Sequence, residues 1–263
     1  MKLSNRLGLA RALVLLLFCA CVALAQLDKK PYTEWSEKEA DKVLNDSGWG
    51  QTQTFTDTSL QKSSIAEDPK TASRSQRNNS GLNQGDLDTA GSTDLGGTRV
   101  SDVPIVNFRM RFLSARPVRE AIVRMLAIRR KQEPAEQLAA QFKKFIDSDA
   151  TDQIIIAVVC DAPKVTASFQ KARALLSNLT TAELKSNTFL YIKGGERVPL
   201  EEYQPPRPDG LGARFIFPRV VNGKPVITPE SGEARFYSEL SDKLTLNRKF
   251  RVKDMMYQGK LEY

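Results

Sequence analysis

Histidine is absent from all 263 residues of this sequence. Without an imidazole, the chain has no Ser-His-Asp or Cys-His catalytic group and no histidine-ligated zinc. A histidine switch in the physiological pH range is excluded for the same reason. Hydrolytic chemistry, if there is any, must come from carboxylates.

Apolar runs of the roughly 20 residues that span a membrane are absent after the start of the chain. The first 25 residues have the pattern of a secretory signal: a basic segment with Lys2, Arg6 and Arg11, an apolar segment from Leu13 to Phe18, and the small-residue motif Ala23-Leu24-Ala25. We predict cleavage after Ala25 and export to the periplasm or the extracellular space, without a transmembrane span in the mature chain.

Cysteine is scarce, with three residues in the whole sequence. Cys19 and Cys21 lie in the predicted signal peptide, so an intrachain disulfide is excluded. Lipid attachment at Cys21 is the less favoured alternative, because Phe18 stands where a lipobox usually has leucine. Cys160 ends an apolar run, and burial there raises the pKa of the thiol and makes it inert.

Sequence motifs of known activity are also missing, among them G-x-G-x-x-G, the P-loop and G-x-S-x-G. We therefore predict no catalytic residue, no cofactor and no metal. Loss of the three signal-peptide cations lowers the formal charge from +8 to +5. An exported basic protein suits an anionic envelope surface or glycan rather than nucleic acid.

Residues 26–58 are predicted to form a short module of one capped helix and one strand. Ser36 and Glu39 have the spacing of a capping box, and Gly48 suits the turn after the helix. Trp35 and Trp49 flank this helix. Since so short a helix is marginal alone, it either docks on the rest of the chain or binds a protein partner; docking is favoured.

Residues 59–98 are rich in Ser, Thr, Asn, Gly and Asp, and they are predicted to be a disordered linker. Residues 99–263 are predicted to form one α+β domain, in which a mixed, mainly antiparallel sheet packs against several helices. The apolar run from Gln153 to Cys160 is typical of a central strand. The pairs Gly194-Gly195 and Asn222-Gly223 indicate hairpin turns.

Two predicted strands carry cations at alternating positions, which places them on one face of each strand: Arg109 and Arg111 in the first, and Lys249, Arg251 and Lys253 in the second. If both strands lie in one sheet, these side chains form a platform for anionic headgroups or glycans. A solvated face that discourages aggregation is the alternative.

The sequence thus favours an exported, non-catalytic binding or envelope-associated protein that uses the basic strands or the segment from Trp35 to Trp49. The alternative is a glycan hydrolase that uses Asp and Glu. Asp161, which follows the central strand, and the neighbours Glu201 and Glu202 are the acids near predicted strand ends. Adjacent strand residues point to opposite faces, so Glu201 and Glu202 do not serve one site without a bulge.

Overall fold

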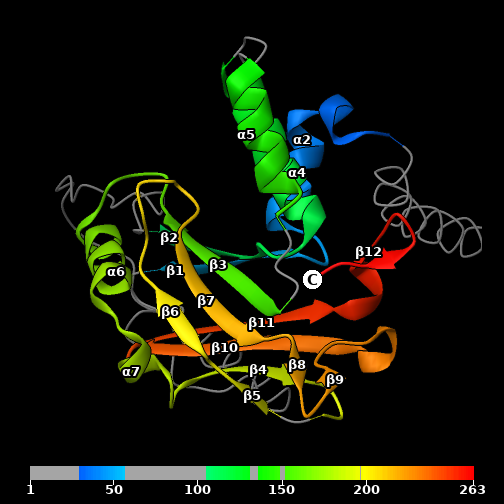
Figure 1. The fold of residues 1–263 in the computed structure, drawn as a ribbon. Coiled ribbons are helices and arrows are strands. Elements are labelled where there is room, and N and C mark those ends of the chain that lie inside the picture. Colours follow the sequence, from blue (N-terminus) through cyan, green and yellow to red (C-terminus); the bar gives the residue numbers. More distant parts are fainter. Residues whose placement is uncertain (1–29, 57–104, 131–135, 149–151, 196) are drawn as a thin grey trace, which may run out of the picture.

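The computed structural model describes residues 30–56, 105–130, 136–148, 152–195 and 197–263. The predicted signal peptide, with its cleavage site and Cys21, lies outside the described residues, as does the predicted linker at 59–98. The described residues therefore comprise a short N-terminal segment and most of the region predicted as the α+β domain (Figure 1).

A five-stranded sheet forms one layer of the fold. Its strands, in spatial order, are β1 (Gly50–Thr56), β2 (Ile105–Phe112), β3 (Gln153–Asp161), β7 (Ala213–Pro218) and β6 (Glu202–Gln204). Every neighbouring pair is antiparallel. The apolar run predicted as a central strand is β3, which lies in the middle of this sheet.

A four-stranded sheet forms the other layer. Its strands, in spatial order, are β11 (Leu244–Arg251), β10 (Glu233–Ser241), β4 (Thr188–Ile192) and β5 (Arg197–Pro199). Its pairs are also antiparallel. Two short hairpins accompany the layers: β8 (Val220–Val221) with β9 (Lys224–Pro225), and β12 (Met256–Tyr257) with β13 (Lys260–Leu261). Both predicted turns, Gly194-Gly195 and Asn222-Gly223, connect hairpin strands.

The main core lies between the two sheets. Residues alternate between buried and more exposed along β2 and β10, as expected for strands with one face in the core. Phe112 packs edge-to-face on Phe250 of the opposite sheet, and Phe215 packs similarly on Phe236. The helices and antiparallel sheets confirm the α+β class. One detail differs from the expected single mixed sheet, because the described strands form two main antiparallel sheets and two short hairpins.

One glutamine side chain links the two sheets along an edge. Gln53 of β1 donates to the carbonyl of Thr245 at 2.9 Å and accepts from the backbone N–H of Asn247 at 2.8 Å. Both partners belong to β11, the edge strand of the other sheet. The amide side chain thereby satisfies backbone groups that an exposed edge would leave unpaired.

Helices cover the sheets on one side and at one end. They are α2 (Glu37–Asn45), α4 (Arg116–Arg130), α5 (Glu136–Ile146), α6 (Ala167–Asn178) and α7 (Thr181–Leu184), with 3-10 turns η2 (Tyr32–Glu34), η4 (Pro229–Ser231) and η5 (Val252–Asp254). Figure 1 shows α4 and α5 side by side above the sheets, with α2 next to α4. Across the described part of the chain, no helix is long and apolar enough to cross a membrane.

Candidate functional site

The segment from Trp35 to Trp49 docks on the remainder of the fold. Its helix α2 has the predicted capping box, in which Ser36 and Glu39 exchange side-chain and backbone hydrogen bonds. Trp35 is 0% exposed and Trp49 is 4% exposed. The Trp49 indole N–H donates to the carbonyl of Glu262 at 2.8 Å, and both indoles lie edge-on to Tyr257. The two tryptophans therefore belong to the core, and neither offers a surface to a partner.

Arg111 of β2 does not face water as the strand pattern predicted. Its guanidinium donates to the carbonyl of Leu44 at 3.0 Å and to the side-chain oxygen of Asn45 at 2.8 Å, both at the end of α2. Burial lowers the pKa of Arg111 to about 10, and the positive charges of Arg109 and Arg129 act in the same direction. Arg111 thus serves as a cation at a helix C-terminus.

Arg109 lies in the floor of a groove on the outer face of the five-stranded sheet. Its Nε is 2.6 Å from a carboxylate oxygen of Asp161, in a geometry that suits an ion pair and not a hydrogen bond. Asp41 of α2 is 3.9 Å from the same guanidinium. The groove encloses about 360 Å³ between α2, α4 and the loop before β7.

The cations of the second predicted strand lie elsewhere. Lys249 and Arg251 belong to β11, in the four-stranded sheet, while Lys253 lies in η5. Lys249 is 3.5 Å from Glu233, and Arg251 is 2.6 Å from Asp254. Arg109 and Arg111 thus lie in the five-stranded sheet, whereas the second set lies in β11 and η5. The condition for a shared platform, that both strands belong to one sheet, is not met.

The acids weighed for hydrolysis do not converge either. Asp161 is paired with Arg109, and Glu201 and Glu202 are both exposed, with Glu202 accepting from Gln204. Cys160 is half-buried and its pKa is raised to about 12, first by burial and then by the charge of Asp161, as an inert thiol requires.

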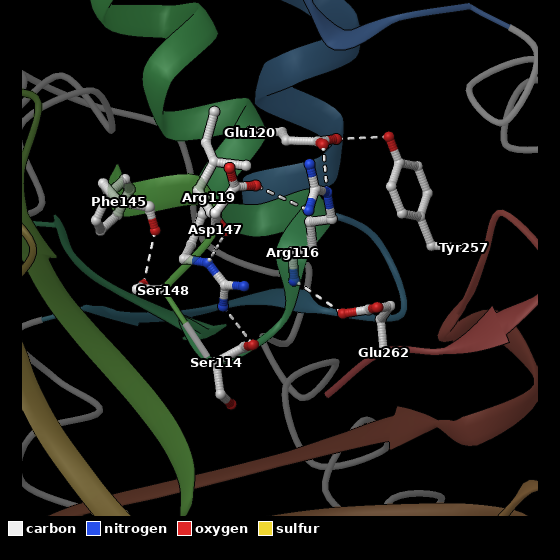
Figure 2. A network of polar contacts seen from close by, with 10 residues as sticks. Ser114, Arg116, Arg119, Glu120, Phe145, Asp147, Ser148, Tyr257 and Glu262 are labelled. Carbon is white, nitrogen blue, oxygen red and sulfur yellow. Dashed lines mark hydrogen bonds and ion pairs between the residues drawn. The ribbon is translucent and has the colours of Figure 1, made fainter. Parts of the chain in front are cut away.

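A buried carboxylate that the sequence did not single out is Glu120 (Figure 2). It accepts from Arg116 Nε at 2.9 Å and from the Tyr257 hydroxyl at 2.5 Å. Arg116 also contacts Asp147, and its backbone N–H donates to Glu262. Glu120 does not line the groove that contains Arg109. The network joins α4 to the residues around β12 and β13, so its role is to hold these elements together.

A second, larger cleft was not predicted from the sequence. It encloses about 700 Å³ between the β4–β5 hairpin, the β8–β9 hairpin and η4. Lys193, Arg197 and Lys224 line it, with Glu230 as the acid among its described lining residues. The Arg197 guanidinium lies 3.7 Å from the centre of the Phe189 ring, a cation–π contact that fixes its position.

The cations of this larger cleft have no carboxylate partner among the described residues. Within the described ranges, Lys193, Arg197 and Lys224 take part in no ion pair. All three are exposed. The signal in the sequence was the presence of a cation beside each predicted hairpin turn, but nothing local indicates that the two hairpins meet.

The fold and these clefts define an α+β protein with two antiparallel layers and two separate concave surfaces. No family model, curated protein or solved structure matches the chain. No group of three or more Cys, Asp or Glu side chains is arranged to hold a metal ion in the part of the chain that the structure describes.

Proposed function

We propose that this chain is an exported, non-catalytic binding protein, and that the 700 Å³ cleft takes an anionic glycan. The observation that carries the proposal is the set of three cations without carboxylate partners in one cleft, opposed by Glu230 alone among the described lining residues. A ligand that brings negative charge supplies the missing partners. The volume lies in the range of small-ligand sites.

The lining supports a ligand with both charge and apolar surface. Val198, Pro199 and Val226 line the cleft beside the cations. The C–H faces of sugar rings suit such apolar contacts, while their carboxylates suit lysine and arginine. The predicted export signal supports this ligand class, because acidic glycans are found outside the cytoplasm.

Isothermal titration calorimetry with tetragalacturonate tests the proposal. Each exposed cation–anion contact contributes about 0.2–1 kcal/mol, so loss of three contacts weakens binding by about tenfold. The variant Lys193→Gln/Arg197→Gln/Lys224→Gln removes these three contacts. The matched control is Lys249→Gln/Arg251→Gln/Lys253→Gln, which removes the same charge from β11 and η5. We expect the control to bind within twofold of wild type.

Equal weakening in the two triple variants would mean that net charge, and not the cleft, attracts the glycan. Neutral cellotetraose should not bind. A parallel titration with phosphatidylglycerol vesicles separates a glycan ligand from an anionic membrane surface. Release of reducing ends from tetragalacturonate, lost in Asp161→Asn, would instead establish the glycan hydrolase alternative.

A further inference from the structure

The 360 Å³ groove under α4 differs in chemistry from the 700 Å³ cleft lined by Lys193, Arg197 and Lys224, the basic cleft. Its floor contains Arg109 and Asp161, and one wall is formed by Ile122, Met125 and Leu126 of α4. The groove therefore offers a charged floor and an apolar wall along the same concave surface. That combination fits an amphiphile better than it fits a sugar.

The charges around the groove do not cancel. Arg109, Arg111 and Arg129 lie close enough for Arg109 and Arg129 to disfavour the charge on Arg111. Asp41 and Asp161 are the acids that oppose this effect. Asp209 also lines the groove, but it is occupied by an ion pair with Arg214. Three arginines against two aspartates leave one positive charge for a ligand to balance.

Arg129 is the arginine of the groove whose N–H donors are available to a ligand. Its side chain is exposed on α4, and no described hydrogen bond or ion pair includes it. An arginine presents five N–H donors and binds a carboxylate with two of them at once. A carboxylate in the groove mouth would therefore add a partner without displacing the Arg109–Asp161 pair.

The apolar wall is open to water in the absence of a ligand. Leu126 is 40% exposed although it lies between residues of α4 that are partly or wholly buried. Across the groove, Val159 and Leu211 contribute further apolar surface. Apolar surface on both sides of one groove is the arrangement that favours burial of an alkyl chain.

We propose that this groove is a second binding site, independent of the basic cleft, and that it takes a fatty-acid-like amphiphile with a single carboxylate. The carboxylate contacts Arg129 at the groove mouth, next to Arg109. The alkyl chain lies against Leu126 and Ile122 on one side and Leu211 on the other.

Titration of the full chain with decanoate, below its micelle concentration, tests the site. We expect saturable binding of one decanoate per chain and no saturable binding of decanol, which has the same chain without the charge. Arg129→Gln should weaken decanoate binding at least fivefold, and Leu126→Asp should abolish it. Both side chains are exposed, so circular dichroism of the variants should match the wild type.

Arg130→Gln is the matched control, because Arg130 is the next residue of α4, is exposed, and does not line the groove. It should bind decanoate as the wild type does. The triple variant of the basic cleft should also keep decanoate binding. The proposal for the groove and the proposal for the basic cleft are therefore tested independently.

Three results would overturn the proposal: no saturation by decanoate, equal losses in the Arg129 and Arg130 variants, or unchanged binding in Leu126→Asp. A fourth result would change the proposed ligand: the groove binds the peptide acetyl-Ala-Leu-Leu, which has a free carboxylate, and does not bind decanoate. That outcome would assign the groove to a peptide terminus and refute the fatty-acid assignment.

Discussion

Removal of one hydroxyl, in Tyr257→Phe, tests whether the buried network around Glu120 stabilises the fold. The Tyr257 hydroxyl is 2.5 Å from Glu120, and Glu120 is nearly inaccessible to water. The substitution keeps the ring and its edge-on contacts with Trp35 and Trp49. It therefore removes a charge-assisted hydrogen bond with little change in packing.

A hydrogen bond to a charged group contributes about 1.5–3 kcal/mol, because its loss leaves a buried ion with one donor fewer. Glu120 keeps its contact with Arg116 at 2.9 Å, so we place the cost near the lower part of this range, at about 2 kcal/mol. For a domain of this size, that corresponds to a fall of about 4–8 °C in the melting temperature.

Urea denaturation followed by tryptophan fluorescence measures the effect. Because both indoles are buried, native emission should be blue-shifted and should move to longer wavelength on unfolding. Tyr191→Phe is the control: its half-buried ring packs on Phe189 and Tyr237, and its hydroxyl takes part in no described hydrogen bond. It should change stability by less than about 0.5 kcal/mol.

The double variant Tyr257→Phe/Glu120→Gln completes the test. If the hydroxyl acts through the carboxylate, the two losses are not additive, and the coupling free energy should reach about 1 kcal/mol or more. A loss below about 0.5 kcal/mol in Tyr257→Phe would show that the hydroxyl contributes no net stability, and strict additivity in the cycle would show that it does not act through Glu120.

Two further predictions concern a carboxylate and a glycine. Lys30 and then Ser36 lower the pKa of Glu39 from its ordinary 4.5 to about 2, so its stabilising effect is complete above about pH 4.5 and is lost as the pH falls through about 2. Glu39→Gln should be less stable than wild type at pH 7, by less than about 1 kcal/mol because the Lys30–Glu39 ion pair is partly exposed. The urea midpoints of the two proteins should converge near pH 2. A difference between the midpoints that does not change with pH would contradict this. Gly212 has a φ of +87°, and a Cβ there would lie 2.3 Å from the Val158 carbonyl oxygen. Gly212→Ala should cost more than about 2 kcal/mol, against about 1 kcal/mol for Gly194→Ala, which has a similar φ but open space; equal costs by urea denaturation would refute the steric argument.

Features that depend on a few neighbouring residues could be predicted from the sequence. The helix cap at Ser36 requires a partner three residues away, and the Gly194-Gly195 turn requires only its two flanking strands. The central position of β3 followed from an apolar run that must be covered on both faces. In each case the determining contact is local or is set by composition.

Features that depend on strand order could not be predicted in the same way. Alternation along β2 correctly separated the core face from the arginine face, but it did not show that α2 covers that second face. The sequence indicated Arg109 as an anion-binding residue and Asp161 as a candidate acid for hydrolysis. The antiparallel register of β2 and β3 instead brings the two side chains together as an ion pair. The basic cleft likewise requires two hairpins to meet, which no local pattern specifies.

The hydrogen bond between Trp49 and Glu262 has a consequence for the timing of folding, because it joins residues 213 positions apart. At translation rates of about 5–20 residues per second, synthesis of the intervening chain takes about 10–40 s. During that interval, Trp49 has been synthesised but its acceptor does not yet exist. The docked position of α2 is therefore completed late, and contacts of such long sequence separation predict slow folding. A chaperone that holds the nascent chain would find an uncovered indole at this segment throughout that time.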